Sequence, residues 1–235
     1  MPIGSMYENG TYLARNPTWH AEDSPWKAKQ IINMLRRNHV KPTTVCEIGC
    51  GAGEILRCLA DEYGGDVDFS GYEISPQAYE ICKEKERPNL HFLLENLVER
   101  EAAIDRAFDL VLVIDVIEHI EDCFGFLRQM RTKGEFKLFH IPLDVSVESV
   151  LLGFILDGRA SAGHIHYFTK ETALAALQDT GYTIIDSCHT CGYIDLPNPR
   201  WKANLLKIPR GMFFALHQDW AARIMGRCSL LVLAK

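Results

Sequence analysis

Glycine stands at every second position in the segment EIGCGAGE at residues 47–54, which has a glutamate at each end and lies between an apolar run and an amphipathic stretch. Glycines at a strand-to-helix turn let the backbone bend sharply and let a ligand approach without obstruction by Cβ atoms. A dinucleotide-binding turn would need glycine at position 54, where Glu54 stands. The alternative is a turn whose glycines serve only the backbone. We favour a nucleotide-type pocket, formed by Glu47, Gly49, Cys50, Gly51 and Gly53.

A second carboxylate, Glu73, ends the next predicted strand, twenty residues after Gly53. At that position a carboxylate can accept hydrogen bonds from both hydroxyl groups of a ribose. The alternative is a solvated glutamate at a strand end. The pairing with the glycine turn favours the ribose role.

Three histidines lie in segments that could face an acceptor molecule. His119 stands in DVIEHIED at residues 115–122, and His164 and His166 stand in SAGHIHYFT at 161–169. Alternation in an extended segment would point His164 and His166 the same way. Imidazole suits a general base for a hydroxyl or protonated amine. The alternatives are a helix cap for His119 and structural roles for the other two.

Apolar strands and amphipathic helices alternate through the middle of the chain, which predicts an α/β, doubly wound, mostly parallel sheet with helices on both faces. Ser24-Pro25 predicts the N-cap and first turn of an earlier helix that ends at Lys41-Pro42. The elements predicted from there on are strands at 44–49, 67–73, 90–95, 108–115 and 135–142, and helices at 53–63, 75–86, 97–105 and 121–132.

After Pro142 the pattern changes. Thr169 predicts a helix N-cap and Gly181 a C-cap. The nearly forty residues between the last two strands are too many for an empty loop, so we expect a helical cap there. The predicted elements are helices at 145–158 and 169–181, strands at 182–189 and 228–235, and the cap at 190–227.

The composition describes an ordinary folded protein. The chain has 235 residues, 47% hydrophobic and 24% charged, enough for one large domain. Its 25 basic and 31 acidic residues disfavour a nucleic-acid partner. The start lacks a signal-peptide pattern and no apolar run is long enough to cross a membrane, so we expect a cytoplasmic protein without membrane contact.

Eight cysteines are scattered through the chain, most of them in apolar periodic segments. We expect free thiols in a reducing compartment. Cys188 and Cys191 have the spacing of zinc ligands or of a redox pair, but a second ligand pair is missing. We therefore expect no metal site.

The three motifs EIGCGAG (47–53), DVIEHI (115–120) and GHIHYFT (163–169) resemble those of class I S-adenosylmethionine-dependent methyltransferases of the small-molecule type. The resemblance runs from Thr44 to Lys235. It implies a seven-stranded sheet with an antiparallel last strand, and in-line transfer of a methyl group from S-adenosylmethionine, which leaves S-adenosylhomocysteine. The implied acceptor is an oxygen or nitrogen atom of a small metabolite, with sugars and glycoconjugate precursors among the candidates.

The resemblance also implies roles for single residues. Glu47 would support the cationic amino-acid part of the cofactor, and Ile74 would pack on the adenine. Asn96, where many relatives have aspartate, and Leu97 would contact the adenine as well. The backbone of Asp115 and Val116 would lie along the methionine part.

The resemblance suggests a single domain, 1–235, with a cofactor-binding core at 44–142 and an acceptor cap at 190–227. Residues 1–40 would form an N-terminal lid and helix over the site. The aromatic residues of this segment either cover the cofactor or pack on the sheet edge: Tyr7, Tyr12, Trp19, His20 and Trp26.

Two other classes of function stay open. A scaffold protein could keep the fold without catalysis, although it would not need an intact glycine turn. An NAD-dependent oxidoreductase would need the glycine spacing that Glu54 interrupts. The motif N-P-P-[YF] of amino-methylating nucleic-acid enzymes is missing. We expect a small-molecule acceptor and a monomer or homodimer.

Overall fold

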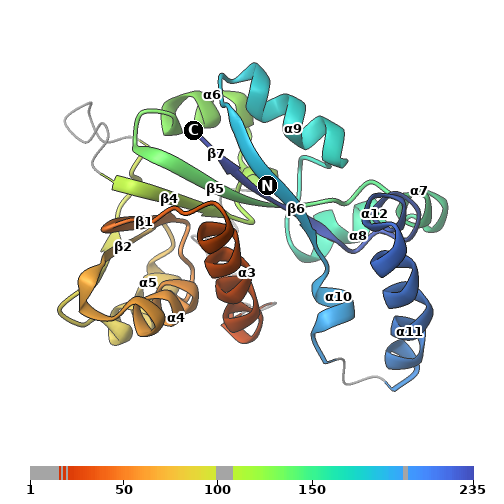
Figure 1. The fold of residues 1–235 in the computed structure, drawn as a ribbon, viewed down its shortest axis with the longest axis horizontal. Coiled ribbons are helices and arrows are strands. Elements are labelled where there is room, and N and C mark those ends of the chain that lie inside the picture. Colours follow the sequence, from red (N-terminus) through yellow and green to blue (C-terminus); the bar gives the residue numbers. More distant parts are fainter. Residues whose placement is uncertain (1–15, 17, 20, 99–107, 198–200) are drawn as a thin grey trace.

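A computed structural model of the chain describes residues 16, 18, 19, 21–98, 108–197 and 201–235. Seven strands form one sheet in the order β3-β2-β1-β4-β5-β7-β6 (Figure 1). β7 runs antiparallel to both of its neighbours, and the pairs among the first five strands are parallel. This confirms the predicted fold class. The strands are β1 (Thr44–Ile48), β2 (Asp68–Glu73), β3 (Leu90–Leu94), β4 (Phe108–Ile114), β5 (Gly134–Pro142), β6 (Ile184–Thr190) and β7 (Ser229–Ala234).

Helices cover both faces of the sheet (Figure 1). Helices α3 (Ser24–Arg37), α4 (Glu54–Tyr63) and α5 (Pro76–Cys82) pack on one face. Helices α6 (Cys123–Met130) and α9 (Lys170–Asp179) pack on the other face. Each face has its own cluster of buried apolar side chains, because strands buried on both sides need a layer of helices on each.

β1 and β4 are paired neighbours in the middle of the sheet, and the strand order reverses between them. Ile48 of β1 lies in register with Val113 of β4, so the two chains leave the sheet side by side. Open α/β sheets bind their ligands at such a switch point, outside the carboxyl ends of the strands. The glycine turn after β1 and Asp115 after β4 therefore meet at one edge.

Two helix predictions need correction. Ser24 is the first residue of α3 and Asp23 takes the N-cap position, with the 3-10 turn η1 (Ala21–Asp23) before it. The single helix predicted at 145–158 is two helices, α7 (Val147–Leu152) and α8 (Phe154–Ser161). Gly153 between them has φ +74°, a left-handed conformation that ends α7.

Other predicted helices are close to their expected places. The helix at 75–86 ends earlier as α5 and continues into the 3-10 turn η3 (Lys83–Lys85), and another such turn, η2 (Gly64–Asp66), follows α4. The N-cap Thr169 accepts the amide hydrogen of Thr172, as predicted. Of the helix predicted at 97–105, residues 99–105 lie outside the described residues.

The long connection between β6 and β7 is helical, as expected. It contains α10 (Gly192–Asp195), α11 (Trp201–Leu216) and α12 (Gln218–Met225). Both carboxylate oxygens of Glu148 in α7 accept hydrogen bonds of 2.7 Å from Nη2 of Arg210 in α11. This pair joins the connection to the segment after β5.

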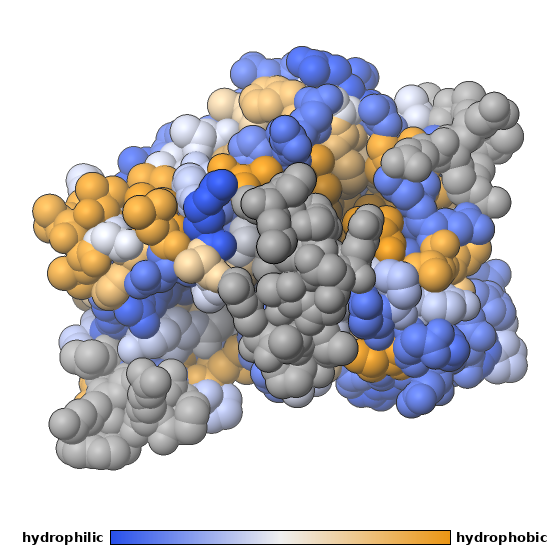
Figure 2. Space-filling view, turned by 180° about the vertical axis from the view of Figure 1, so that it is seen from behind, coloured by the Kyte–Doolittle hydropathy of each residue, from blue (hydrophilic) through white to orange (hydrophobic). Residues whose placement is uncertain are grey.

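Apolar side chains gather on the outer surface of α7 and α8 (Figure 2). The most exposed of them are Leu151 and Leu156. Within the described parts of the chain, every helix is too short or too polar to cross a membrane. All eight cysteines are free thiols, as expected.

Candidate functional site

A cavity of about 680 Å³ opens at the carboxyl edge of the sheet, between the turn after β1, the end of β4 and the helical connection before β7. Most of the residues predicted for the site line this cavity. They are Glu47, Gly49, Cys50, Gly51, Glu73, Ile74, Asp115, Val116, His119 and His164.

The turn after β1 depends on left-handed backbone at its glycines. Gly49 has φ +68° and Gly51 has φ +53°, values that residues with a Cβ rarely adopt. The amide groups of Gly49 and Cys50 both donate to the carbonyl of Tyr72 at the end of β2. The turn is thereby tied to the neighbouring strand, and its backbone faces the cavity.

The carboxylate of Glu73 is held by three backbone amides. Oε2 accepts from Gly51 at 2.8 Å, and Oε1 accepts from Ile74 at 2.9 Å and Ser75 at 2.8 Å. Burial raises the pKa of Glu73, and these three hydrogen bonds act against that shift. A carboxylate can accept about four hydrogen bonds, so Glu73 retains capacity for a ligand hydroxyl.

Glu47 is buried beneath the cavity on β1. Its Oε2 accepts no hydrogen bond from any described residue. Burial raises the pKa of this carboxyl well above its usual value, and the charge of Lys27 opposes the shift. Buried carboxyl oxygens in folded proteins almost always have a partner, so this oxygen is a candidate contact for a cationic ligand.

Asp115 connects three parts of the fold. Its Oδ2 lies 2.7 Å from Nζ of Lys27 in α3, and its Oδ1 lies 2.6 Å from Nδ1 of His140 in β5. Nε2 of His140 in turn lies 2.9 Å from Oγ1 of Thr190. Burial raises the pKa of Asp115, but the nearby His140 and Lys27 outweigh it and hold the pKa well below its usual value.

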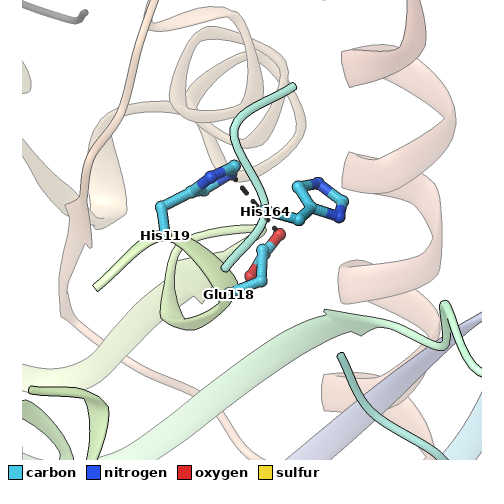
Figure 3. A group of neighbouring side chains, drawn as sticks. All are labelled: Glu118, His119 and His164. Atoms are coloured by element: carbon cyan, nitrogen blue, oxygen red, sulfur yellow. Dashed lines mark ion pairs between the residues drawn. The ribbon is translucent and has the colours of Figure 1, made fainter. Parts of the chain in front are cut away.

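Glu118, His119 and His164 form a compact group at another part of the cavity wall (Figure 3). Glu118 and His119 belong to the 3-10 turn η5 (Ile117–His119), and His164 follows α8. Nε2 of His119 lies 3.7 Å from Oε1 of Glu118. Burial lowers the pKa of His119 to about 4, and the neighbouring His164 contributes to this shift.

Four predicted site residues are not among those that line the cavity. Gly53 instead allows close packing, since a Cβ there would lie 2.5 Å from the Phe92 ring. Asn96 accepts the amide hydrogen of Val98 through Oδ1, and Leu97 is fully buried in the core. Nε2 of His166 lies 2.8 Å from the carbonyl oxygen of Ile120.

Several cavity residues were missed by the sequence analysis. Lys27 and His140 reach Asp115 from two other elements, and Tyr193 and Arg227 come from the two ends of the helical connection. A local pattern cannot identify them, because each depends on packing between distant segments. Of the predicted aromatic lid, Trp19 and Trp26 line the cavity, while Tyr7, Tyr12 and His20 lie outside the described residues.

Comparison with known proteins identifies relatives of this chain. A family model described as "Methyltransferase domain" matches residues 20–187. Ajmaline N-methyltransferase from Rauvolfia serpentina is 32% identical over 95 residues. That alignment covers 38% of this chain and spans only 32% of the length of the relative.

Solved structures share the fold at low sequence identity. The N-methyltransferase NodS from Bradyrhizobium japonicum WM9, in complex with S-adenosyl-L-homocysteine, has a TM-score of 0.59 at 16% identity, covering 96% of this chain and 97% of its own. Magnesium protoporphyrin IX methyltransferase from Synechocystis PCC 6803, with bound S-adenosylhomocysteine, also has a TM-score of 0.59, at 14% identity, covering 89% of this chain and 82% of its own.

Proposed function

Since this chain belongs to the class I S-adenosylmethionine-dependent methyltransferase family, we propose that it transfers the methyl group of S-adenosylmethionine to a nitrogen or oxygen atom of a small metabolite. The observation that carries the proposal is that Glu47, Glu73 and the helical connection line the same cavity. One part of this cavity suits the cofactor, and the rest is available to an acceptor.

The residues at the strand ends fit the cofactor. Bound S-adenosylmethionine supplies a methyl group that is already activated on a sulfonium. The free oxygen of Glu47 suits its ammonium group, and the remaining capacity of Glu73 suits its ribose hydroxyls. Ile74 is 49% exposed at the cavity and offers an apolar surface to the adenine. The backbone of Asp115 and Val116 would lie along the methionine part.

The acceptor would bind between η5 and the helical connection. His119 and His164 line this part of the cavity, as do Tyr193, Leu196 and Arg227 from the connection. We assign the connection at 190–227 the role of acceptor cap, and the segment at 1–40 that of an N-terminal lid and helix. A cavity of about 680 Å³ falls in the range of small-molecule sites, which supports a metabolite.

Amines come first among the acceptors to test, because the curated relative is named for N-methylation. Much of the rate can come from holding two reactants in line, so a strong base is not required. Sugars and glycoconjugate precursors form the second class for the test.

The proposal is tested by incubating the protein with methyl-labelled S-adenosylmethionine and a panel of amine, phenol and sugar acceptors. We expect labelled product and S-adenosylhomocysteine in equal amounts with at least one acceptor. Tight cofactor binding without turnover on any acceptor would overturn the proposal and favour a non-catalytic scaffold. Binding of NAD in place of S-adenosylmethionine would favour the oxidoreductase.

A further inference from the structure

We propose that Glu118, His119 and His164 form a binding site for one divalent transition-metal ion. The three residues offer a carboxylate oxygen and two imidazole nitrogens, all within 4.8 Å of one another. Two histidines and one carboxylate are a set that zinc, iron and cobalt ions bind. The proposal departs from the expectation of no metal, which considered only the spacing of Cys188 and Cys191.

The carboxyl group of Glu118 is the first observation that indicates a missing ligand. Its side chain is 0% exposed, and apart from its own backbone amide no described residue donates a hydrogen bond to either oxygen. Folded proteins leave few buried polar atoms unsatisfied, and an unseen ion is one of the physical reasons for such a case. An ion bound by Glu118 would satisfy these oxygens.

The two imidazole rings are already oriented by other groups. Nδ1 of His164 lies 2.6 Å from Oδ2 of Asp144, and the ring of His119 is hydrogen-bonded to the backbone of Gly163. Metal-binding histidines almost always use one ring nitrogen in this way, which leaves the other nitrogen for the ion. Both arrangements are the ones that a metal site requires.

Backbone hydrogen bonds hold the two segments of the group together. The carbonyl oxygen of Glu118 accepts from the amides of Ile165 at 2.8 Å and His166 at 3.1 Å. The separation of 3.7 Å between Glu118 and His119 is near the ~3.4 Å between neighbouring ligands of a tetrahedral zinc ion. The ring of His164 adjoins that of His119, with 5.0 Å between the ring centres, and all three ligand atoms lie within 4.8 Å of one another.

Charge around the group favours a cation. Burial raises the pKa of Glu118 well above its usual value, and the neighbouring carboxylates of Asp115 and Asp144 raise it further. Lys27, whose charge also acts on Glu118, already forms an ion pair with Asp115. A divalent ion would balance the remaining negative charge.

Three protein ligands leave at least one coordination position open, and all three residues line the cavity. That position is accessible to water or to an acceptor atom. A metal there would orient the acceptor beside the cofactor, a role that rests on the proposed function. The metal site itself is argued only from the residues of this chain.

Metal binding can be measured without cofactor or acceptor. The purified full chain is treated with a chelator, dialysed, and titrated with Zn²⁺ and Co²⁺ by calorimetry, with Co²⁺ absorption as a second readout. We expect one ion per chain. If the full chain binds neither ion, the metal site is overturned. If it binds metal but gives no product in the methyl-transfer assay, only the proposed function is overturned.

Variants make the test specific. Glu118→Gln keeps the shape of the side chain and should weaken Zn²⁺ binding by about 100-fold, and Asp144→Asn by about 10-fold. His166→Gln is the control, because His166 lies two residues from His164 but contacts the Ile120 carbonyl instead. Equal affinity of wild type and Glu118→Gln, or equal losses in Glu118→Gln and His166→Gln, would overturn the site.

Discussion

Oδ1 of Asp115 lies 2.6 Å from Nδ1 of His140, although 25 residues separate the two in sequence. β4 and β5 are parallel neighbours, and Ile114 lies opposite His140 in the register. Asp115 has φ +54°, which turns the chain away from the sheet while its carboxylate stays directed at the ring. The same carboxylate binds Lys27 of α3, so one side chain connects the sheet, a helix and the cavity.

The substitution Asp115→Asn should reduce the free energy of unfolding by about 3 kcal/mol, because it leaves the Lys27 ammonium without a counter-charge in a largely buried place. Asparagine tolerates a positive φ, so the backbone is retained. Urea unfolding of both proteins at neutral pH measures the difference. Asp109→Asn, at the half-buried start of β4, retains an oxygen that can accept from Thr43 and Thr44, so it should cost much less and serves as control.

The contribution of the Lys27–Asp115 pair to the free energy of unfolding should depend on pH, because the pKa of Asp115 is lowered. A carboxyl group with a lowered folded-state pKa stabilises the fold above its unfolded value of about 3.9, and the contribution is lost as the pH falls through the folded value. The stability gap between wild type and Asp115→Asn should therefore be constant above about pH 5 and shrink below about pH 4. A gap that stays constant in acid would contradict this.

Local patterns in the sequence were sufficient for the parallel strands and the strand-end residues, whereas the antiparallel last strand was expected from the family resemblance. Glu47 lies near the end of one apolar strand, the glycines follow that strand, and Glu73 ends the next one, so periodicity places them at the ligand-binding edge. The Lys27 to Asp115 pair was not predictable, because it depends on how α3 packs across the sheet. Gly153 was missed for a related reason, since a glycine within a helical pattern does not reveal its backbone angle.

The substitution Gly53→Ala tests whether Gly53 serves close packing, since Gly53 does not line the cavity. Its φ of +72° disfavours a side chain, and a Cβ would lie 2.8 Å from the Cβ of Cys82 as well as against Phe92. We expect Gly53→Ala to lower the free energy of unfolding by about 3 kcal/mol, from the backbone and the overpacking together. Chemical denaturation measures the loss.

The matched control for Gly53 is Gly153, which has nearly the same backbone angle at φ +74°. Its two chain neighbours apart, no described residue comes within 4 Å of the position that a Cβ would take. Gly153→Ala should cost about 1 kcal/mol, the backbone part alone. Equal losses in the two variants would show that packing against Phe92 contributes nothing.

Glu73 should contribute to cofactor affinity through its charge. Glu73→Gln replaces one acceptor oxygen by a donor, so we expect the affinity for S-adenosylmethionine to fall about 10-fold or more. Calorimetric titration measures the change, after a thermal melt has shown that the variant is folded. The same substitution at Glu95, after the end of β3, should leave the affinity unchanged. A Glu73→Gln variant that binds like wild type would remove Glu73 from the site.

Cofactor binding should release a proton from Glu47. Burial raises the pKa of this carboxyl well above its usual value, so part of the protein carries it protonated where an ordinary glutamate is ionised. A bound ammonium group would stabilise the ionised form and lower the pKa. The affinity for S-adenosylmethionine should therefore increase as the pH rises above the usual titration range of a glutamate, in line with proton linkage.

Calorimetry in two buffers with different ionisation enthalpies measures the proton directly, because a released proton adds the heat of buffer protonation to the signal. The Glu47→Gln variant keeps the shape of the side chain and cannot release a proton, so its binding heat should be the same in both buffers. It should also bind the cofactor more weakly, since its side chain offers no charge to the ammonium group. If the variant releases as many protons as wild type, the proton comes from another group and Glu47 is not the contact for the ammonium.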